Sequence, residues 1–136
     1  MENKIRQTDL PDVLALAYLG DAIFSHAVRR RLVARGISRN GELTRLSLAY
    51  VTAEAQSEGF MLIEPILTEN EKALAKRAEN SKHLNRPRHA SPANYRRATA
   101  LEALFGMLEV TGQNDRLKEL TDRVLAGLAH REETLP

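Results

Sequence analysis

The sequence predicts a single all-α domain, and three observations lead to that prediction. Alanine, leucine, glutamate and arginine, which all favour helices, are abundant among the 136 residues. Apolar residues recur at intervals of three and four, as they do on one face of a helix. No run of alternating β-branched residues is long enough to predict a strand. We therefore expect one helical bundle with its core within about residues 10–128.

The first helix is predicted over residues 11–35. Pro11 suits a first helical turn, and Gly36 is a typical C-terminal stop. Gly20 lies inside this segment, where a glycine costs a helix about 1 kcal/mol relative to alanine. Such a residue is tolerated where two backbones approach each other, so Gly20 predicts a close contact with another helix.

The middle of the chain predicts two further helices. The first is expected as one continuous segment over residues 41–58, and Pro65 separates it from the next. Thr68 and Glu71 form an S/T-x-x-E capping box, which is typical of a helix start. The helix that they begin is expected to end near Glu79.

The last third of the chain predicts a loop followed by two helices. Residues 80–90 show no apolar period and are expected to form a basic loop. Ser91 and Pro92 are typical N-cap and first-turn residues, and they begin a helix that ends near Val110. A final helix is predicted over residues 115–128, and the segment beyond it is expected to fray.

The composition excludes several classes of site. Because there is no cysteine, disulfides, thiolate metal sites and a cysteine nucleophile are all absent. Tryptophan is absent and aromatic residues make up only 4%, which argues against a single-strand binder built on stacked bases. Tyr18 and Tyr95 are expected to be core or supporting groups. No apolar run is long enough for a membrane span, and residues 1–12 lack a hydrophobic signal core. We expect a cytoplasmic protein with no membrane partner.

Charge is unevenly distributed along the chain. The formal net charge is only +2, yet residues 29–47 carry +5 and residues 72–97 carry +7. The remaining residues are therefore acidic. Two basic blocks on an otherwise acidic domain are typical of a surface that faces a polyanion, although each could also be a solvated helix face.

Two carboxylates lie within apolar segments of the predicted helices. Asp21 and Glu102 both have mainly apolar neighbours at helical spacing. Burying an unpaired carboxylate is costly, so each needs a partner, a bound metal or a raised pKa. Local explanations exist: Asp21 could cap a helix that restarts after Gly20, and Glu102 could pair with Arg29 or Arg97.

Considered together, the two acids favour a shared site. Gly20 stands beside Asp21, and Gly106 follows Glu102 by one helical turn. Two helices that each carry a glycine and an acid can approach closely and bring both carboxylates to one point. Two oxygen ligands with room for water are typical of a Mg²⁺ or Mn²⁺ site. Beside basic blocks, this pattern predicts metal-dependent phosphodiester chemistry.

These residues resemble the signature motifs of the ribonuclease III family. Residues 18–22, YLGDA, match its L-G-D-A core, and residues 101–106, LEALFG, match its second motif, F-E-A-L-x-G. The chain is similar, more specifically, to the Mini-ribonuclease III subfamily, whose motifs correspond to residues 15–22 and 95–106. The resemblance covers the chain from about Leu10 to Leu128.

The sequence departs from the wider family at several positions. Ala17 and Thr99 stand where the wider family has an acid before the aspartate and before the glutamate, which leaves two of the usual four carboxylates, and Leu14 stands at the position of another family acid. That reduced set is itself the pattern of the Mini-ribonuclease III subfamily. Relative to the subfamily, Ser25 replaces a glutamate, and Glu79 replaces the second arginine of an R-G-R-N segment.

The resemblance implies a fold, an activity and a set of functional residues. The fold would be a homodimeric helical bundle without a double-stranded RNA-binding domain. The activity would be cleavage of double-stranded RNA, leaving 5′-phosphate and 3′-hydroxyl ends. Asp21 and Glu102 would be both the catalytic residues and the ligands of Mg²⁺, with Mn²⁺ as an alternative ion. The candidate RNA-binding residues are Arg77, Asn80, Lys82, Arg86, Arg88, Arg96 and Arg97.

The resemblance also suggests biological partners. The expected substrate is the precursor of 23S ribosomal RNA, and a ribosomal protein is a candidate helper. Two other classes of function stay open on the sequence alone. One is a protein of the same fold that binds structured RNA without cutting it. The other is a helical interaction module with no RNA partner, which the paired motifs and the basic loop disfavour.

Overall fold

All regular structure is helical across residues 4–81 and 91–136, the parts of the chain that this computed structural model describes. This confirms the predicted fold class. No helix in these two segments is long and apolar enough to cross a membrane. The helices are α1 (Val13–Ala34), α2 (Asn40–Val51), α3 (Ala53–Ile63), α4 (Glu69–Glu79), α5 (Pro92–Val110) and α6 (Asn114–Leu128), with short 3₁₀ helices η1 (Gln7–Asp9), η2 (Glu64–Ile66) and η3 (Ala129–Thr134).

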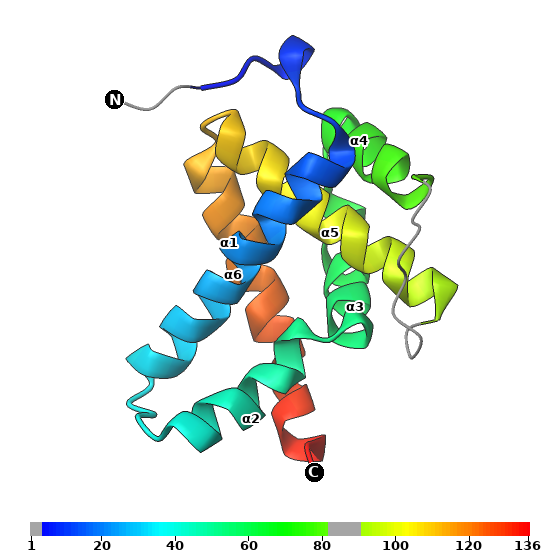
Figure 1. The fold of residues 1–136 in the computed structure, drawn as a ribbon. Coiled ribbons are helices and arrows are strands. Elements are labelled where there is room, and N and C mark those ends of the chain that lie inside the picture. Colours follow the sequence, from blue (N-terminus) through cyan, green and yellow to red (C-terminus); the bar gives the residue numbers. More distant parts are fainter. Residues whose placement is uncertain (1–3, 82–90) are drawn as a thin grey trace.

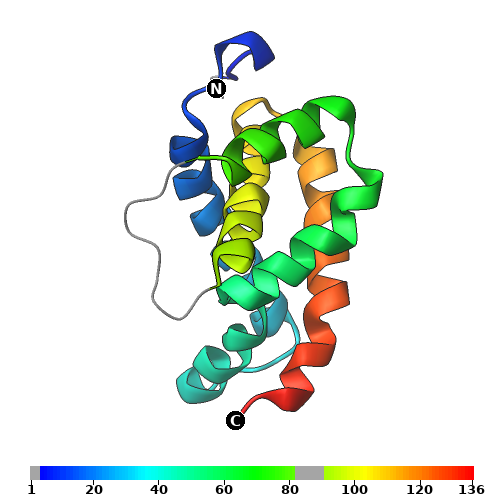
Figure 2. The same cartoon turned by 90° about the vertical axis from the view of Figure 1, so that its right-hand side faces the viewer.

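Helix α5 forms the centre of the domain. Its segment 98–108 is buried at every position except Glu102, which is partly buried. Figure 1 shows α1 crossing α5, and Figure 2 shows α5 between α1 on one side and α3 with α6 on the other. Phe24 of α1 packs against Phe105 of α5, with ring centroids 6.0 Å apart. A helix enclosed in this way is apolar on all sides, so an acid within it stands out.

The predicted helix boundaries are confirmed where local signals were strong. The Thr68 hydroxyl accepts the backbone N–H of Glu71, while a Glu71 carboxylate oxygen accepts that of Thr68, which completes the capping box of α4. The Ser91 side chain caps α5, whose first residue is Pro92. Gly36 ends the first helical segment with φ at +88°, a conformation that favours glycine.

The segment predicted as one helix over residues 41–58 is instead two helices. Thr52 has extended backbone, with ψ at 156°, and interrupts the segment between α2 and α3. Its hydroxyl oxygen accepts the backbone N–H of Ala55 at 3.2 Å, so the same residue caps α3. This break lets α2 pack on α1 while α3 turns onto α5.

The C-terminal segment is ordered by polar contacts, whereas fraying was predicted. Glu132 in η3 accepts hydrogen bonds from Arg35, at 2.7 Å, and from the Tyr50 hydroxyl. Arg131 donates to Glu58 at 2.8 Å. Burial, followed by the hydrogen bond to Glu132, raises the pKa of Tyr50 to about 12. These contacts fix η3 to the ends of α1 and α2 and to the middle of α3.

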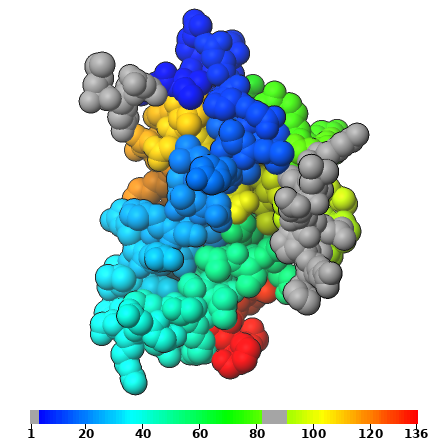
Figure 3. All heavy atoms as spheres, viewed as in Figure 1, coloured from blue at the N-terminus to red at the C-terminus, as the bar shows by residue number. Residues whose placement is uncertain are grey.

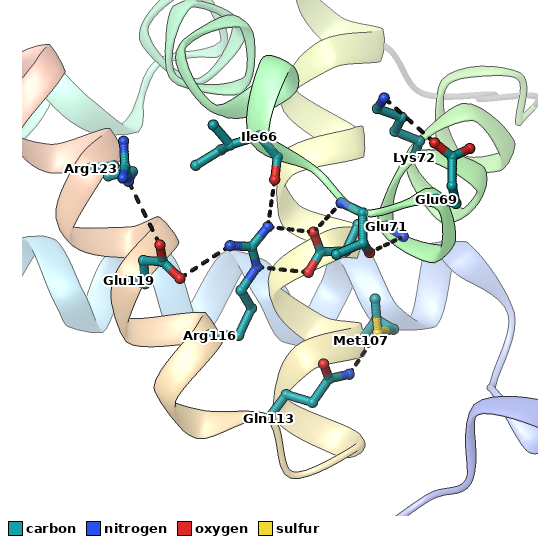
Figure 4. Close-up of polar contacts among 10 residues, drawn as sticks. Ile66, Glu69, Glu71, Lys72, Met107, Gln113, Arg116, Glu119 and Arg123 are labelled. Atoms are coloured by element: carbon teal, nitrogen blue, oxygen red, sulfur yellow. Dashed lines mark hydrogen bonds and ion pairs between the residues drawn. The ribbon is translucent and has the colours of Figure 1, made fainter.

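A charged clamp joins α6 to α4 (Figure 4). Arg116 donates to both carboxylate oxygens of Glu71, at 2.9 and 2.8 Å, and to the backbone oxygen of Ile66 at 2.8 Å. The Glu71 side chain is only 4% exposed. Burial alone would raise the pKa of Glu71, but the hydrogen bonds from Arg116 and Thr68 outweigh it and hold that pKa below its ordinary value.

Candidate active site

Two glycines allow α1 and α5 to cross in backbone contact. A Cβ added to Gly20 would lie 1.7 Å from the backbone oxygen of Glu102, and one added to Gly106 would lie 2.0 Å from that of Leu16. The helices therefore run in opposite directions at the crossing. The close approach predicted from Gly20 is confirmed, and its partner is the helix that carries the second motif.

The crossing brings Asp21 and Glu102 to the same surface depression. Its volume is about 330 Å³, and it opens to solvent beside α1. The residues that line it come from the two crossing helices: Leu14, Ala17, Tyr18, Asp21, Tyr95, Thr99 and Glu102. In Figure 3, α1 forms a ridge across this face, with a strip of α5 visible beside it. The two predicted catalytic residues are thus next to each other in space.

The two carboxylates differ in their surroundings. Asp21 is exposed, and Glu102 is partly buried. Burial, together with the hydrogen bond and the charge repulsion of Asp21, raises the pKa of Glu102 to about 8. Because Glu102 is partly buried beside Asp21, its carboxyl group is readily protonated. A divalent cation would relieve the same repulsion.

The local explanations for the two acids are not supported. Helix α1 is continuous through Gly20, so Asp21 caps no restarted helix. Among the ion pairs of the described residues, none joins Glu102 to Arg29 or Arg97. Of the apolar residues at helical spacing from Asp21, Ala17, Phe24 and Val28 are buried as expected, but Asp21 itself is exposed, so the expectation that it projects into a buried stripe is wrong for a single chain.

Gln56 is a site residue that the sequence did not reveal. It lies in α3, is only 4% exposed, and its amide acts to lower the pKa of the Glu102 carboxyl group, against the raising effects of burial and Asp21. Its Nε2 also donates to the backbone oxygen of Val51 at 3.5 Å. The available signal was a single amide residue in α3, a helix that also carries two glutamates. Gln56 becomes recognisable as a site residue only when the fold is known, because the packing of α3 against α5 brings it near Glu102.

Four of the candidate RNA-binding residues lie at the ends of α4 and α5. Arg77 and Asn80 are exposed at the end of α4, and Arg96 is exposed in the second turn of α5. Arg97 is partly buried, and its Nη1 donates to the Ser57 hydroxyl at 3.5 Å. Figure 2 shows that the end of α4 and the start of α5 lie on the side of the domain that α1 occupies. The other three candidates, Lys82, Arg86 and Arg88, lie outside the described residues.

Glu79 lies close to this basic group. It is partly buried at the last residue of α4. Burial and the nearby Glu64 raise its pKa, while the positive charges of Arg97 and Arg96 act in the opposite direction. The acid that replaces the subfamily's second arginine therefore lies within the electrostatic range of two candidate RNA-binding residues.

The donor set of the depression fits a hard divalent cation. Carboxylate oxygens are the ligands that Mg²⁺ prefers, and Mg²⁺ commonly keeps several waters beside one or two carboxylates. No group of three His, Asp or Glu side chains with metal-binding geometry occurs within residues 4–81 and 91–136. The depression therefore offers two protein ligands, Asp21 and Glu102, and leaves the other coordination positions open to water or phosphate.

Comparison with known proteins agrees with this geometry. A family model described as "Ribonuclease III domain" matches residues 14–113. Mini-ribonuclease 3 of Brevibacillus brevis is 37% identical over 92% of this chain and 93% of its own length. Mini-ribonuclease 3 of Symbiobacterium thermophilum is 44% identical over 79% of this chain and 82% of its own. A crystal structure of a Fusobacterium nucleatum protein superposes with a TM-score of 0.80 at 31% identity, covering 90% of this chain and 98% of that one.

The family match includes both crossing helices, and both motif residues lie inside it. The fold, the paired carboxylates and the matching domain define a class of protein, the ribonuclease III endonucleases. The chain belongs to this family, within its Mini-ribonuclease III group, and it is an endoribonuclease.

Proposed function

We propose that this endoribonuclease cleaves double-stranded RNA with a divalent cation held by Asp21 and Glu102. Mg²⁺ is the proposed ion, and Mn²⁺ is the alternative. The observation that carries the proposal is the placement of these two carboxylates in one open depression, next to a backbone contact between their helices. A cation bound there would stabilise charge on the reacting phosphate and lower the pKa of water.

The chain's own residues would perform the remaining work. Glu102 is held by a central, buried helix, so its position is defined by the core. Asp21 on the exposed side of α1 leaves the depression accessible to a phosphate from solvent. The cleavage would leave 5′-phosphate and 3′-hydroxyl ends, as the family resemblance implies.

RNA would be held by the basic residues at the ends of α4 and α5. Arg77, Asn80, Arg96 and Arg97 flank residues 82–90, which carry Lys82, Arg86 and Arg88. Arginine and lysine side chains along a duplex contact phosphates and 2′-hydroxyl groups without reading the sequence. Their position beside α1 supports one continuous surface for RNA and metal.

The exposed face of α1 supports a homodimer. Leu14 and Tyr18, one turn apart, are 40% and 85% exposed, and Ala22 continues the same stripe. Apolar side chains at helical spacing on an outer face are typical of a covered interface. A second copy of the chain packed on this face would cover the stripe and place two depressions on one dimer.

The precursor of 23S ribosomal RNA is the proposed substrate, with a ribosomal protein as the candidate helper and the cytoplasm as the location. The resemblance to the Mini-ribonuclease III group supports these three assignments. A test of the substrate is primer extension on ribosomal RNA from cells that lack the protein. Accumulation of extended 23S ends would support the assignment, and normal ends would contradict it.

Cleavage of a labelled RNA duplex tests the proposed site. Asp21→Asn and Glu102→Gln are each expected to reduce the Mg²⁺-dependent rate by about 100-fold or more, because even outer-shell partners of a metal commonly contribute 10–100-fold. Glu109→Gln, which removes an exposed acid from the same helix as Glu102, is the matched control. Full activity of Asp21→Asn would overturn the assignment of the ligands.

Light scattering on the purified chain tests the dimer. The wild-type protein is expected at twice the mass of one chain, and Tyr18→Arg is expected to shift it toward a monomer. Leu48→Arg, at a leucine of α2 that is 44% exposed, is the control. A wild-type monomer at micromolar concentration would contradict the proposal.

A further inference from the structure

We propose that Arg116 is a positioning residue that holds helix α4 in the orientation in which its basic end binds RNA. This inference rests on the function proposed above, because that function assigns Arg77 and Asn80, at the end of α4, to the RNA surface. Arg116 lies on α6 and contacts α4 at its opposite end, through Glu71. It would therefore act on RNA binding without touching the duplex.

The contact between Arg116 and α4 is fixed in direction as well as in distance (Figure 4). The guanidinium donates from Nε to Oε2 of Glu71 at 2.9 Å and from Nη2 to Oε1 at 2.8 Å. Two bonds between two planar groups restrict their relative rotation, which a single bond would allow. The guanidinium is itself held in place, because Nη2 donates to the Ile66 oxygen at 2.8 Å and Nη1 to Glu119 at 3.1 Å.

The apolar packing of α4 is light, so the charged contact contributes much of what fixes this helix. The buried face of α4 consists of Glu71, Leu74, Ala75 and Ala78. Leu74 is a large apolar side chain, whereas each alanine contributes a single methyl group and few contact atoms. Glu71 is 3% exposed and belongs to the first turn of α4. The polar member of the buried face is therefore the one that is tied to another helix by directional bonds.

The length of α4 makes its basic end sensitive to this contact. Glu71 and Asn80 are nine residues apart, which corresponds to about 13.5 Å along a helix axis. A tilt of about 10° at Glu71 would move Asn80 by about 2 Å, enough to break a hydrogen bond to a phosphate. Arg96 lies on α5, the central helix, and would not follow this movement. Loss of the contact should therefore displace one part of the RNA surface and leave the two carboxylates of the depression in place.

RNA binding by Arg116→Met tests the inference. Affinity for a labelled RNA duplex is measured by fluorescence anisotropy in EDTA, and cleavage is measured in Mg²⁺. We expect the RNA dissociation constant to rise about 5- to 10-fold, as for energetically coupled residues, and KM to rise similarly with kcat within about twofold. Arg131→Met is the matched control, because it removes the same charge from another contact between elements, to Glu58 at 2.8 Å. Its RNA affinity should stay within about twofold of the wild type.

A double-mutant cycle distinguishes positioning from a direct contact with RNA. In the Arg116→Met background, Arg77→Gln should cost much less affinity than in the wild type, because the displaced end of α4 no longer reaches its phosphate. Arg96→Gln, on α5, should cost the same in both backgrounds. Additive effects of Arg116→Met and Arg77→Gln would overturn the inference, since they are expected if Arg116 touches RNA itself.

The double variant Glu71→Gln/Arg116→Met makes the test independent of stability. Arg116→Met alone leaves a buried carboxylate unpaired, whereas the double variant removes that charge and keeps an oxygen that can accept the backbone N–H of Thr68. We expect its urea midpoint to return toward the wild type while its RNA affinity stays reduced. RNA affinity that returns together with stability, or wild-type affinity of folded Arg116→Met, would overturn this inference alone. A wild-type protein whose duplex affinity is unaffected by both Arg77→Gln and Arg96→Gln would overturn the proposed RNA surface as well.

Discussion

Substitution of Gly20 by alanine should separate the two helices that form the active site. The added Cβ would lie 1.7 Å from the backbone oxygen of Glu102 and 2.5 Å from its carbonyl carbon. Ordinary contact begins at 3.4 Å, so the helices would have to move apart by roughly 1.7 Å at this point. Backbone atoms inside a helix cannot turn aside as a flexible side chain can. Overpacking typically costs about 1–3 kcal/mol, and a clash between two backbones belongs at the upper end of that range.

Urea and thermal unfolding of Gly20→Ala measure this cost. We expect a loss of about 3 kcal/mol in the free energy of unfolding, which for a domain of this size lowers Tm by about 10 °C. Cleavage of duplex RNA, measured well below the new Tm, should also fall because Asp21 moves relative to Glu102.

Gly41→Ala is the matched control for the crossing. A Cβ there meets nothing within 4 Å, and the residue lies in α2, so the substitution should stabilise the protein by up to about 1 kcal/mol. A Gly20→Ala protein that melts within about 2 °C of the wild type would refute the reasoning about the crossing.

Four further predictions concern charged side chains. Arg116→Met leaves the carboxylate of Glu71 buried without its partner and should cost about 2–3 kcal/mol in urea unfolding. The pKa of Glu71 is lower in the folded state than in the unfolded chain, whose ordinary value is about 4.3. The stability that the Glu71 charge contributes is therefore present above that value and is lost as pH falls through the folded pKa. The urea midpoints of the wild type and of Glu71→Gln should accordingly converge in acid. Glu132→Gln should lower the pKa of Tyr50 from about 12, which a spectrophotometric titration at high pH would detect, and an unchanged titration would contradict the contact. Arg96→Gln should weaken binding of all RNA duplexes similarly and reduce the slope of log affinity against log salt by about 1, whereas a sequence-dependent loss would contradict a phosphate contact.

Features set by neighbouring residues could be predicted from the sequence. The caps of α4 and α5 depend on Thr68, Glu71 and Ser91, each within three residues of the group that it satisfies. The close crossing at Gly20 was also predictable, because a glycine inside an amphipathic helix has few other uses. Its partner became identifiable only through the second glycine near Glu102.

Features that depend on distant residues could not be predicted in this way. Thr52 breaks a continuous apolar pattern, and nothing nearby distinguishes a capping threonine from a helical one. Glu132 contacts Arg35, 97 residues away, so the order of the C-terminal segment has no local signal. Gln56 and the exposure of Tyr18 depend on which helix faces are covered, and helical periodicity cannot tell a face packed in the core from one that awaits a partner chain.

The backbone contact between Gly20 and Glu102 has a consequence for how the enzyme responds to heat. Many active sites are carried on loops that open locally while the rest of the domain stays folded. Here, both acids lie on helices joined directly through their main chains, and one of these helices is the centre of the core. Local opening of the catalytic pair would therefore require the whole bundle to open. Hydrogen exchange of the Glu102 amide should proceed at the rate of global unfolding, and thermal inactivation should follow the melting curve without an earlier loss of activity.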